Sequence, residues 1–123
     1  MLFDIDGTLL RTGNRVHGRS IIQSAREVTG HDIAAHFGGI DAGGRTDRYI
    51  VSELLRRCGL TQEEIDAAFP EIGARSVELS RLGLAVSDPE WQLPGASALL
   101  AALGGAGVAL GLVTGNLPAI AAL

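Results

Sequence analysis

The sequence predicts an α/β fold in which a helical insertion separates two parallel strands. Residues 1–5 form a short apolar run ahead of Gly7 and Thr8, which is typical of a buried strand followed by a turn. A second apolar run at residues 108–113 predicts another strand, and residues 16–84 between the two have helical periodicity. Without the insertion, the order of elements is strand, helix, strand, which implies a parallel pair joined by a right-handed crossover.

The insertion is predicted to contain three helices. The first covers residues 16–30 and the second residues 45–59, because apolar residues recur on one face of each and a glycine ends each run. A capping box at residues 61–64 predicts the start of the third helix. Pro70 lies inside this third pattern and is expected to interrupt or kink the helix, because proline lacks the N–H that a helix interior uses.

After residue 89 the sequence predicts a helix at 96–103, a glycine-rich turn at 104–107 and then the second strand. A further helix is expected from residue 117, with Pro118 in its first turn. Residues 96–113 contain no charged side chain, so a membrane-spanning helix is the alternative for them. The glycines inside this stretch, its alanine-rich composition and the absence of a flanking arginine disfavour that alternative, and we expect no membrane partner.

Composition excludes several classes of protein. The 123 residues are enough for one domain with a single core. A net charge of −4 argues against a protein that binds nucleic acid electrostatically. Cys58 is the single cysteine, which excludes an internal disulfide and favours a reducing compartment. No signal peptide is recognisable ahead of Asp4, so a cytoplasmic location is expected.

Polar residues follow both predicted strands. Asp4 and Asp6 lie at the carboxyl end of the first strand, and Thr114, Gly115 and Asn116 follow the second. Ligands bind beyond the carboxyl ends of the strands in parallel sheets, so the two groups are expected to lie side by side. Mg²⁺ would relieve the repulsion between the carboxylates, a carboxylate can attack phosphorus, and a hydroxyl with adjacent amides can hold phosphate oxygens.

Each of these motifs also has a simpler interpretation. The two aspartates could belong to a solvated turn, because Asp and Gly are common turn residues. Residues 114–116, taken alone, read as an ordinary strand-to-helix loop in which Asn116 caps the helix. The three histidines, His17, His31 and His36, do not have zinc-ligand spacing and are expected to be solvated or packed.

The two motifs resemble those of a known family. The stretch "DIDGTLL" followed much later by "LVTGN" resembles the first and second motifs of the haloacid dehalogenase (HAD) superfamily of hydrolases. The stretches "GGRTD" at residues 43–47 and "LPGA" at residues 93–96 resemble its phosphoglycolate-phosphatase-like branch. The resemblance implies an incomplete Rossmann-like parallel-sheet core at residues 1–13 and 89–123, with an inserted helical cap at residues 14–88.

The resemblance also implies roles for the motif residues. Asp4 would be the nucleophile and an Mg²⁺ ligand. Asp6 would protonate the leaving alcohol and then activate water, and its backbone carbonyl would also bind the metal. Thr114 would hold the transferring phosphoryl group, together with the amides of Gly115 and Asn116.

In the cap, the resemblance would place Arg45 and Asp47 near the substrate or have them seat the cap. They could equally start a helix, with Asp47 as an acid in the first turn. The sequence departs from the family in having no lysine and no acid after Glu90, whereas the family's third and fourth motifs are a lysine and an acidic pair. We therefore expect a truncated or partial chain with little Mg²⁺-dependent turnover of its own.

The expected function is an Mg²⁺-dependent phosphatase of small phosphomonoesters, similar to phosphoglycolate, acting through an aspartyl-phosphate. The acid at Asp6 favours ester hydrolysis over dehalogenation, because an alkoxide needs a proton to leave and a halide does not. Two alternatives remain at this point: a sugar phosphomutase of the same superfamily, and a fragment that binds phosphate or a partner without catalysis. The expected partner is a small phosphorylated metabolite.

Overall fold

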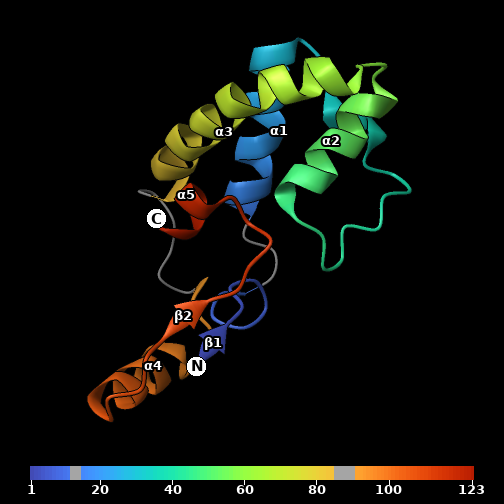
Figure 1. The fold of residues 1–123 in the computed structure, drawn as a ribbon. Coiled ribbons are helices and arrows are strands. Elements are labelled where there is room, and N and C mark those ends of the chain that lie inside the picture. Colours follow the sequence, from blue (N-terminus) through green and yellow to red (C-terminus); the bar gives the residue numbers. More distant parts are fainter. Residues whose placement is uncertain (12–14, 85–90) are drawn as a thin grey trace. The chain divides into compact units, whose positions relative to one another are not determined.

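The computed structural model describes residues 1–11, 15–84 and 91–123 (Figure 1). Of these, 59% lie in helices, and the described strands are β1 (Leu2–Phe3) and β2 (Gly111–Leu112). The predicted α/β fold with a Rossmann-like core is therefore wrong, and the chain is mostly helical. The predicted parallel pairing is confirmed, because Leu2 pairs with Gly111 and Phe3 pairs with Leu112 in parallel register.

The strands are shorter than predicted for a physical reason. The apolar runs at residues 1–5 and 108–113 each reduce to two strand residues. A strand extends only as far as a neighbour supplies hydrogen bonds, and β1 and β2 have only each other in the described sheet. An apolar run indicates that a segment tends to be buried, but it does not show how many neighbouring strands are available for pairing.

The chain divides into two compact units. Unit 1 comprises Met1–Asn14 and Val86–Thr114, and unit 2, called the helical unit below, comprises Arg15–Ala85 and Gly115–Leu123. The division falls between Thr114 and Gly115, inside one predicted phosphate-binding motif. The domain boundaries that the resemblance implies, 1–13 with 89–123 and 14–88, stay a prediction.

The helical unit contains α1 (Arg15–Thr29), the 3-10 helix η1 (Ile33–His36), α2 (Asp47–Arg57), α3 (Gln62–Leu84) and α5 (Pro118–Ala121). These bounds confirm the three predicted helices of the insertion and the helix start at Pro118. Gly30 and Gly59 follow α1 and α2 with φ of 76° and 95°, a backbone conformation that glycine adopts without strain.

Local hydrogen bonds determine the residues at which α2 and α3 begin. The Thr46 hydroxyl accepts a bond from the Tyr49 N–H at 3.2 Å and caps α2. Thr61 and Glu64 form the predicted capping box of α3, with the Thr61 N–H donating to the Glu64 carboxylate at 2.8 Å. α3 continues through Pro70, so the proline does not interrupt it, and the axis of α3 is curved in Figure 1.

The core of the structure belongs to the helical unit. Val51, Leu54 and Leu55 of α2 are at most 1% exposed, and they belong to a cluster built with α1, η1 and α3. The remaining buried members of this cluster are Ile21, Ala25, Ile33, Ile65, Phe69 and Ile72. Burial of this apolar surface is the main stabilising contribution to the helical unit.

Unit 1 contains no buried residue among those described. It holds the strand pair and α4 (Ala96–Gly105), which confirms the predicted helix, and a turn in which the Gly107 N–H donates to Gly104 at 3.0 Å. Residues 9–11 run beside residues 91–93, linked by the Arg11 N–H to the Trp91 carbonyl at 2.8 Å. Within the described ranges, no helix has the length and apolar character needed to cross a membrane.

Candidate functional site

The parallel register brings two predicted site residues to one end of the strand pair. Asp4 directly follows Phe3, and Thr114 lies two residues after Leu112, the strand partner of Phe3. The Val113 N–H donates to the Phe3 carbonyl at 2.9 Å, so the pairing continues up to the residue before Thr114. The carboxylate of Asp4 and the hydroxyl of Thr114 therefore both belong to the carboxyl end of the pair, within unit 1.

A tight turn follows Asp4. One carboxylate oxygen of Asp4 accepts a bond from the Ile5 N–H at 2.8 Å, which orients an otherwise exposed side chain. The Ile5 carbonyl then accepts bonds from the N–H groups of Leu9 and Leu10, each at 2.9 Å. Gly7 has a φ of 79°, which explains why glycine follows the second aspartate. The turn keeps Asp6 and its exposed carboxylate close to the strand end.

The carboxylates of Asp4 and Asp6 are a suitable partial ligand set for Mg²⁺. Over the described ranges, His, Cys, Asp and Glu side chains form no group of three or more that could hold a metal ion. Mg²⁺ is commonly held by one or two carboxylates, with water and substrate phosphate oxygens completing its octahedron. Two exposed carboxylates at one turn fit that mode of binding and do not fit a site made wholly of protein ligands.

The other predicted site residues lie together in the helical unit, at the start of α2. The Asp47 N–H donates to the Gly115 carbonyl at 2.9 Å. A Cβ placed on Gly115 would lie 2.6 Å from the Arg45 carbonyl oxygen, so this position has no room for a side chain. The guanidinium of Arg45 lies over the ring of Tyr49, 5.0 Å from its centroid. Gly115 and residues 45–47, far apart in the sequence, therefore have neighbouring backbones within the helical unit.

Asp47 is a buried carboxylate that joins three segments of the helical unit. Its Oδ1 accepts a bond from His17 Nε2 of α1 at 2.9 Å, and its Oδ2 accepts from the Leu117 N–H at 2.7 Å. Leu117 directly precedes α5. His17 Nδ1 is buried and has no hydrogen-bond partner among the described residues. We call Asp47, His17 and the Leu117 N–H the Asp47 clamp.

The structure thus groups the predicted residues into two sets. Asp4, Asp6 and Thr114 belong to unit 1, whereas Arg45, Asp47, Gly115 and half-buried Asn116 belong to the helical unit. Sequence reasoning missed His17, which was expected to be solvated or packed. Nothing local to His17 indicates its partner, because Asp47 lies 30 positions away on another helix.

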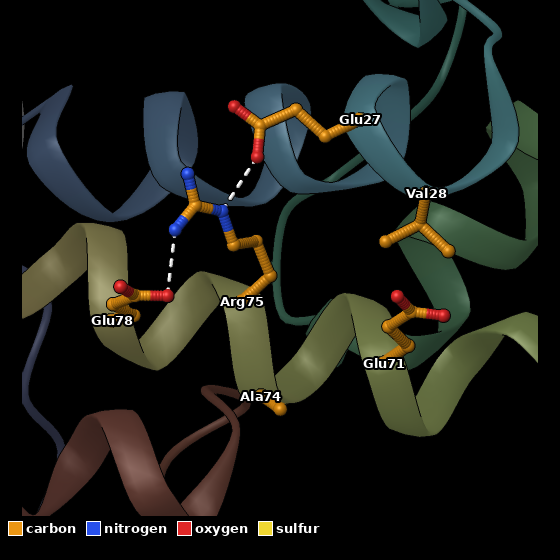
Figure 2. Close-up of a pocket in the computed structure, with 6 residues that line it drawn as sticks. All are labelled: Glu27, Val28, Glu71, Ala74, Arg75 and Glu78. Atoms are coloured by element: carbon orange, nitrogen blue, oxygen red, sulfur yellow. Dashed lines mark hydrogen bonds and ion pairs between the residues drawn. The ribbon is translucent and has the colours of Figure 1, made fainter.

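A pocket in the helical unit lies apart from all of these residues. It has a volume of about 320 Å³ and lies between α1 and α3 (Figure 2). Figure 2 shows Arg75 donating to Glu27 at 2.5 Å and to Glu78 at 2.6 Å. The bond from Arg75, with a second from Gln23, holds the pKa of Glu27 below its ordinary value. The remaining lining residues are Val28, Glu71 and Ala74. The guanidinium of Arg75, which lines this pocket, is therefore already bound to two carboxylates.

No family model matches the chain, and no curated protein matches it.

Proposed function

We propose that the chain binds phosphomonoesters at the shared end of β1 and β2, and that it acts as an Mg²⁺-dependent phosphatase of small phosphorylated metabolites. The observation that supports this most is the strand register, which assigns Asp4 and Thr114 to one end of the parallel pair. The resemblance of "DIDGTLL" and "LVTGN" to the motifs of HAD hydrolases supports the same assignment. The single cysteine supports a cytoplasmic location.

The proposed chemistry is displacement at phosphorus by the Asp4 carboxylate. An Asp4 oxygen forms the new bond to phosphorus while the bond to the ester oxygen breaks, and Asp6 donates a proton to the leaving alcohol. Asp6 then accepts a proton from the water that cleaves the aspartyl-phosphate, which returns Asp4 as a carboxylate and releases phosphate. Thr114 donates its hydroxyl to a phosphoryl oxygen throughout.

Mg²⁺ supplies positive charge next to the phosphoryl oxygens when it is bound. Asp4 and Asp6 would hold it, the latter also through its backbone carbonyl. Both carboxylates carry the same sign of charge as phosphate, so phosphate binding should depend on the metal. Amide donation from Gly115 and Asn116, and substrate contacts by Arg45 and Asp47, stay predictions.

Calorimetric titration of the full chain with inorganic phosphate, with and without Mg²⁺, tests the proposal. We expect Mg²⁺ to strengthen phosphate binding and Asp4→Asn to remove this dependence. Thr114→Val should weaken binding roughly ten-fold, because one hydrogen bond to a charged oxygen is lost. Ser97→Ala removes an exposed hydroxyl elsewhere in unit 1 and should change nothing. Equal phosphate affinity in all four proteins, or binding indifferent to Mg²⁺, would overturn the proposal.

Measurements of turnover distinguish the proposed phosphatase from a phosphomutase and from a non-catalytic phosphate-binding protein. Hydrolysis of a chromogenic phosphate ester should be slow, because the sequence has no lysine to balance the charge of the aspartyl-phosphate and no acid after Glu90 to complete the Mg²⁺ site. Any hydrolysis should disappear in Asp4→Asn, and substantial retained turnover would rule out Asp4 as the nucleophile. A phosphomutase would return the phosphoryl group to a sugar hydroxyl, and a non-catalytic protein would bind phosphate without forming aspartyl-phosphate.

A further inference from the structure

The contact between α1 and α3 changes in character along its length. Glu27, near the end of α1, pairs with Arg75 of α3, and Figure 2 shows this end of the contact together with the pocket. Val16, near the start of α1, lies beside Gly83 near the end of α3, so the two helices run antiparallel. The apolar core cluster reaches Ile72, and no described residue of α3 after Ile72 belongs to it. Beyond Ile72 the contact therefore has a different basis.

Four buried serines occupy the stretch between these two contacts. Ser20 and Ser24 of α1 and Ser76 and Ser80 of α3 are each at most 5% exposed, and we call them the serine interface. In the antiparallel arrangement the two pairs lie in the same part of the contact. A serine side chain is small and polar, so its burial contributes much less free energy than the burial of a leucine or isoleucine side chain. The serine interface is therefore the weakly held part of the α1–α3 contact.

The hydrogen bonds of the serine hydroxyls lie within single helices. The hydroxyls of Ser20, Ser24 and Ser76 each donate at 2.7 Å to the carbonyl four residues earlier in their own helix. The Ser80 hydroxyl is buried and has no hydrogen-bond partner in the part of the chain that the structure describes. A buried hydroxyl without a partner destabilises the closed arrangement, because water would supply one if the helices separated. Separation breaks none of the three bonds and satisfies a fourth hydroxyl.

We infer that residues 77–83, which we call the α3 arm, separate from α1 in a local opening while the apolar core stays packed. Arg75 marks the fixed end of the arm, since it pairs with Glu27 across the two helices. The Asp47 clamp does not oppose the opening. It joins the start of α1 to α2 and to Leu117, and it includes no residue of α3.

The arm lies at the end of the α1–α3 pair where the chain enters and leaves the helical unit. The first stretch of this unit runs from Arg15, where α1 begins, to Ala85, one residue past α3 in the sequence. When the arm and the start of α1 separate, these two points of connection move apart with them. The serine interface thus provides a conformational change within the helical unit that does not depend on the proposed phosphate site.

Thiol labelling of the full chain measures this opening. Ser80→Cys and Ser24→Cys place a thiol, close in shape to the group it replaces, at a buried position in each helix of the serine interface. A buried thiol reacts with a labelling reagent only while its position is exposed, so its rate reports how often the helices separate. Mass spectrometry of the labelled peptides distinguishes these thiols from Cys58. Either variant suffices if the other does not fold.

Val51→Cys is the reference, because Val51 is 1% exposed in the apolar core and valine and cysteine are similar in size. Ser80→Cys and Ser24→Cys should react roughly ten-fold faster or more than Val51→Cys. Low concentrations of urea should not change their rates, because a local opening exposes little surface. Rates equal to that of Val51→Cys, and rising with urea as it does, would show that the helices separate only on global unfolding and would overturn the inference.

Gly83→Ala should increase the opening. A Cβ added at Gly83 would lie 2.5 Å from Val16 Cγ1 and so would force the arm away from α1. Labelling of Ser24→Cys should rise roughly ten-fold, from the usual cost of overpacking, and labelling of Val51→Cys should not. Gly73→Ala is the matched control in the same helix, because its Cβ would meet no atom closer than 3.9 Å. An equal effect of the two alanines on Ser24→Cys, or faster labelling of Val51→Cys in Gly83→Ala, would contradict a separate opening of the arm.

Discussion

Gly115 illustrates how a single residue can be required for reasons that its sequence motif does not reveal. The motif "TGN" suggests that glycine allows the backbone to approach a phosphate. In the structure the glycine allows a close approach to the Arg45 carbonyl, where an added Cβ would lie 2.6 Å from the oxygen. A Cβ atom is not found this close to a backbone oxygen, so the backbone at Gly115 or Arg45 would have to shift to make room for it.

Gly115→Ala should therefore destabilise the helical unit by about 1–3 kcal/mol, the usual cost of forcing extra atoms into a filled position. Thermal unfolding followed by circular dichroism measures this. Gly18→Ala is the matched control, because an added Cβ there, on an exposed face of α1, meets no atom within 4 Å. The control should gain about 0.5–1 kcal/mol from better helix propensity. Equal effects of the two substitutions would show that Gly115 is not tightly packed.

The capping box of α3 is an element whose strength should depend on pH. The Thr61 N–H and the Thr61 hydroxyl donate to the Glu64 carboxylate at 2.8 and 2.9 Å. These two bonds, the backbone one first, hold the pKa of Glu64 below its ordinary value of 4.5. A carboxyl group whose pKa is lowered on folding stabilises the folded state above its unfolded pKa, and this contribution disappears as the pH falls through the folded pKa.

Glu64→Gln should lower the melting temperature near neutral pH, and the difference from the unaltered chain should vanish at a pH below the folded pKa of Glu64. Glutamine can still complete a capping box, so the comparison isolates the charge. Glu63→Gln makes the same change at the neighbouring position in the first turn of α3 and should show a smaller effect. Melting temperatures of these proteins, measured by thermal unfolding at acidic and neutral pH, test this prediction. A melting difference that does not vary with pH would contradict the assigned role of Glu64.

The helices could be predicted because their signals are local. Periodic apolar residues, the glycines at 30 and 59 and the Thr61–Glu64 pair act within one or two turns, and α1, α2 and α3 begin and end close to the expected residues. The fold class could not be predicted, because it depends on how many strands pair, and two apolar runs do not determine that number. The His17–Asp47 contact could not be predicted either, since it depends on how α1 and α2 each pack against α3.

The candidate site shows the same division between local and distant information. The assignment of Asp4 and Thr114 to one strand end follows from a parallel pairing that the sequence predicts. The separation of Thr114 from Gly115 between two compact units does not, because the hydrogen bonds of Gly115 and Leu117 with Asp47 join segments far apart in the sequence. A motif read as one site in the sequence therefore divides between two units.

At the scale of the whole molecule, stability is concentrated in one unit. The described apolar residues that are fully buried all lie in the helical unit, whereas α4 and the strand pair have none. Because burial of apolar area is the dominant stabilising term, cooperative unfolding should report mainly on the helical unit.

Leu55→Ala should accordingly lower the free energy of unfolding by about 2–5 kcal/mol, because it removes a fully buried side chain and leaves a cavity. Leu99→Ala makes the same substitution in α4, where the side chain is 48% exposed. It should change the free energy of unfolding by about 0.5 kcal/mol or less. Chemical denaturation followed by helical signal provides both values. Comparable losses would contradict the concentration of stability in the helical unit.

The central claim is that phosphate binds where β1 and β2 end, beside Asp4 and Thr114. Amide chemical shifts of the full chain, recorded while inorganic phosphate is added in the presence of Mg²⁺, test it most directly. The account predicts that the largest saturable shifts occur at residues 4–8 and at Thr114, and that Asp4→Asn removes them. Saturable shifts confined to another part of the chain, or shifts at these residues that persist in Asp4→Asn, would contradict it.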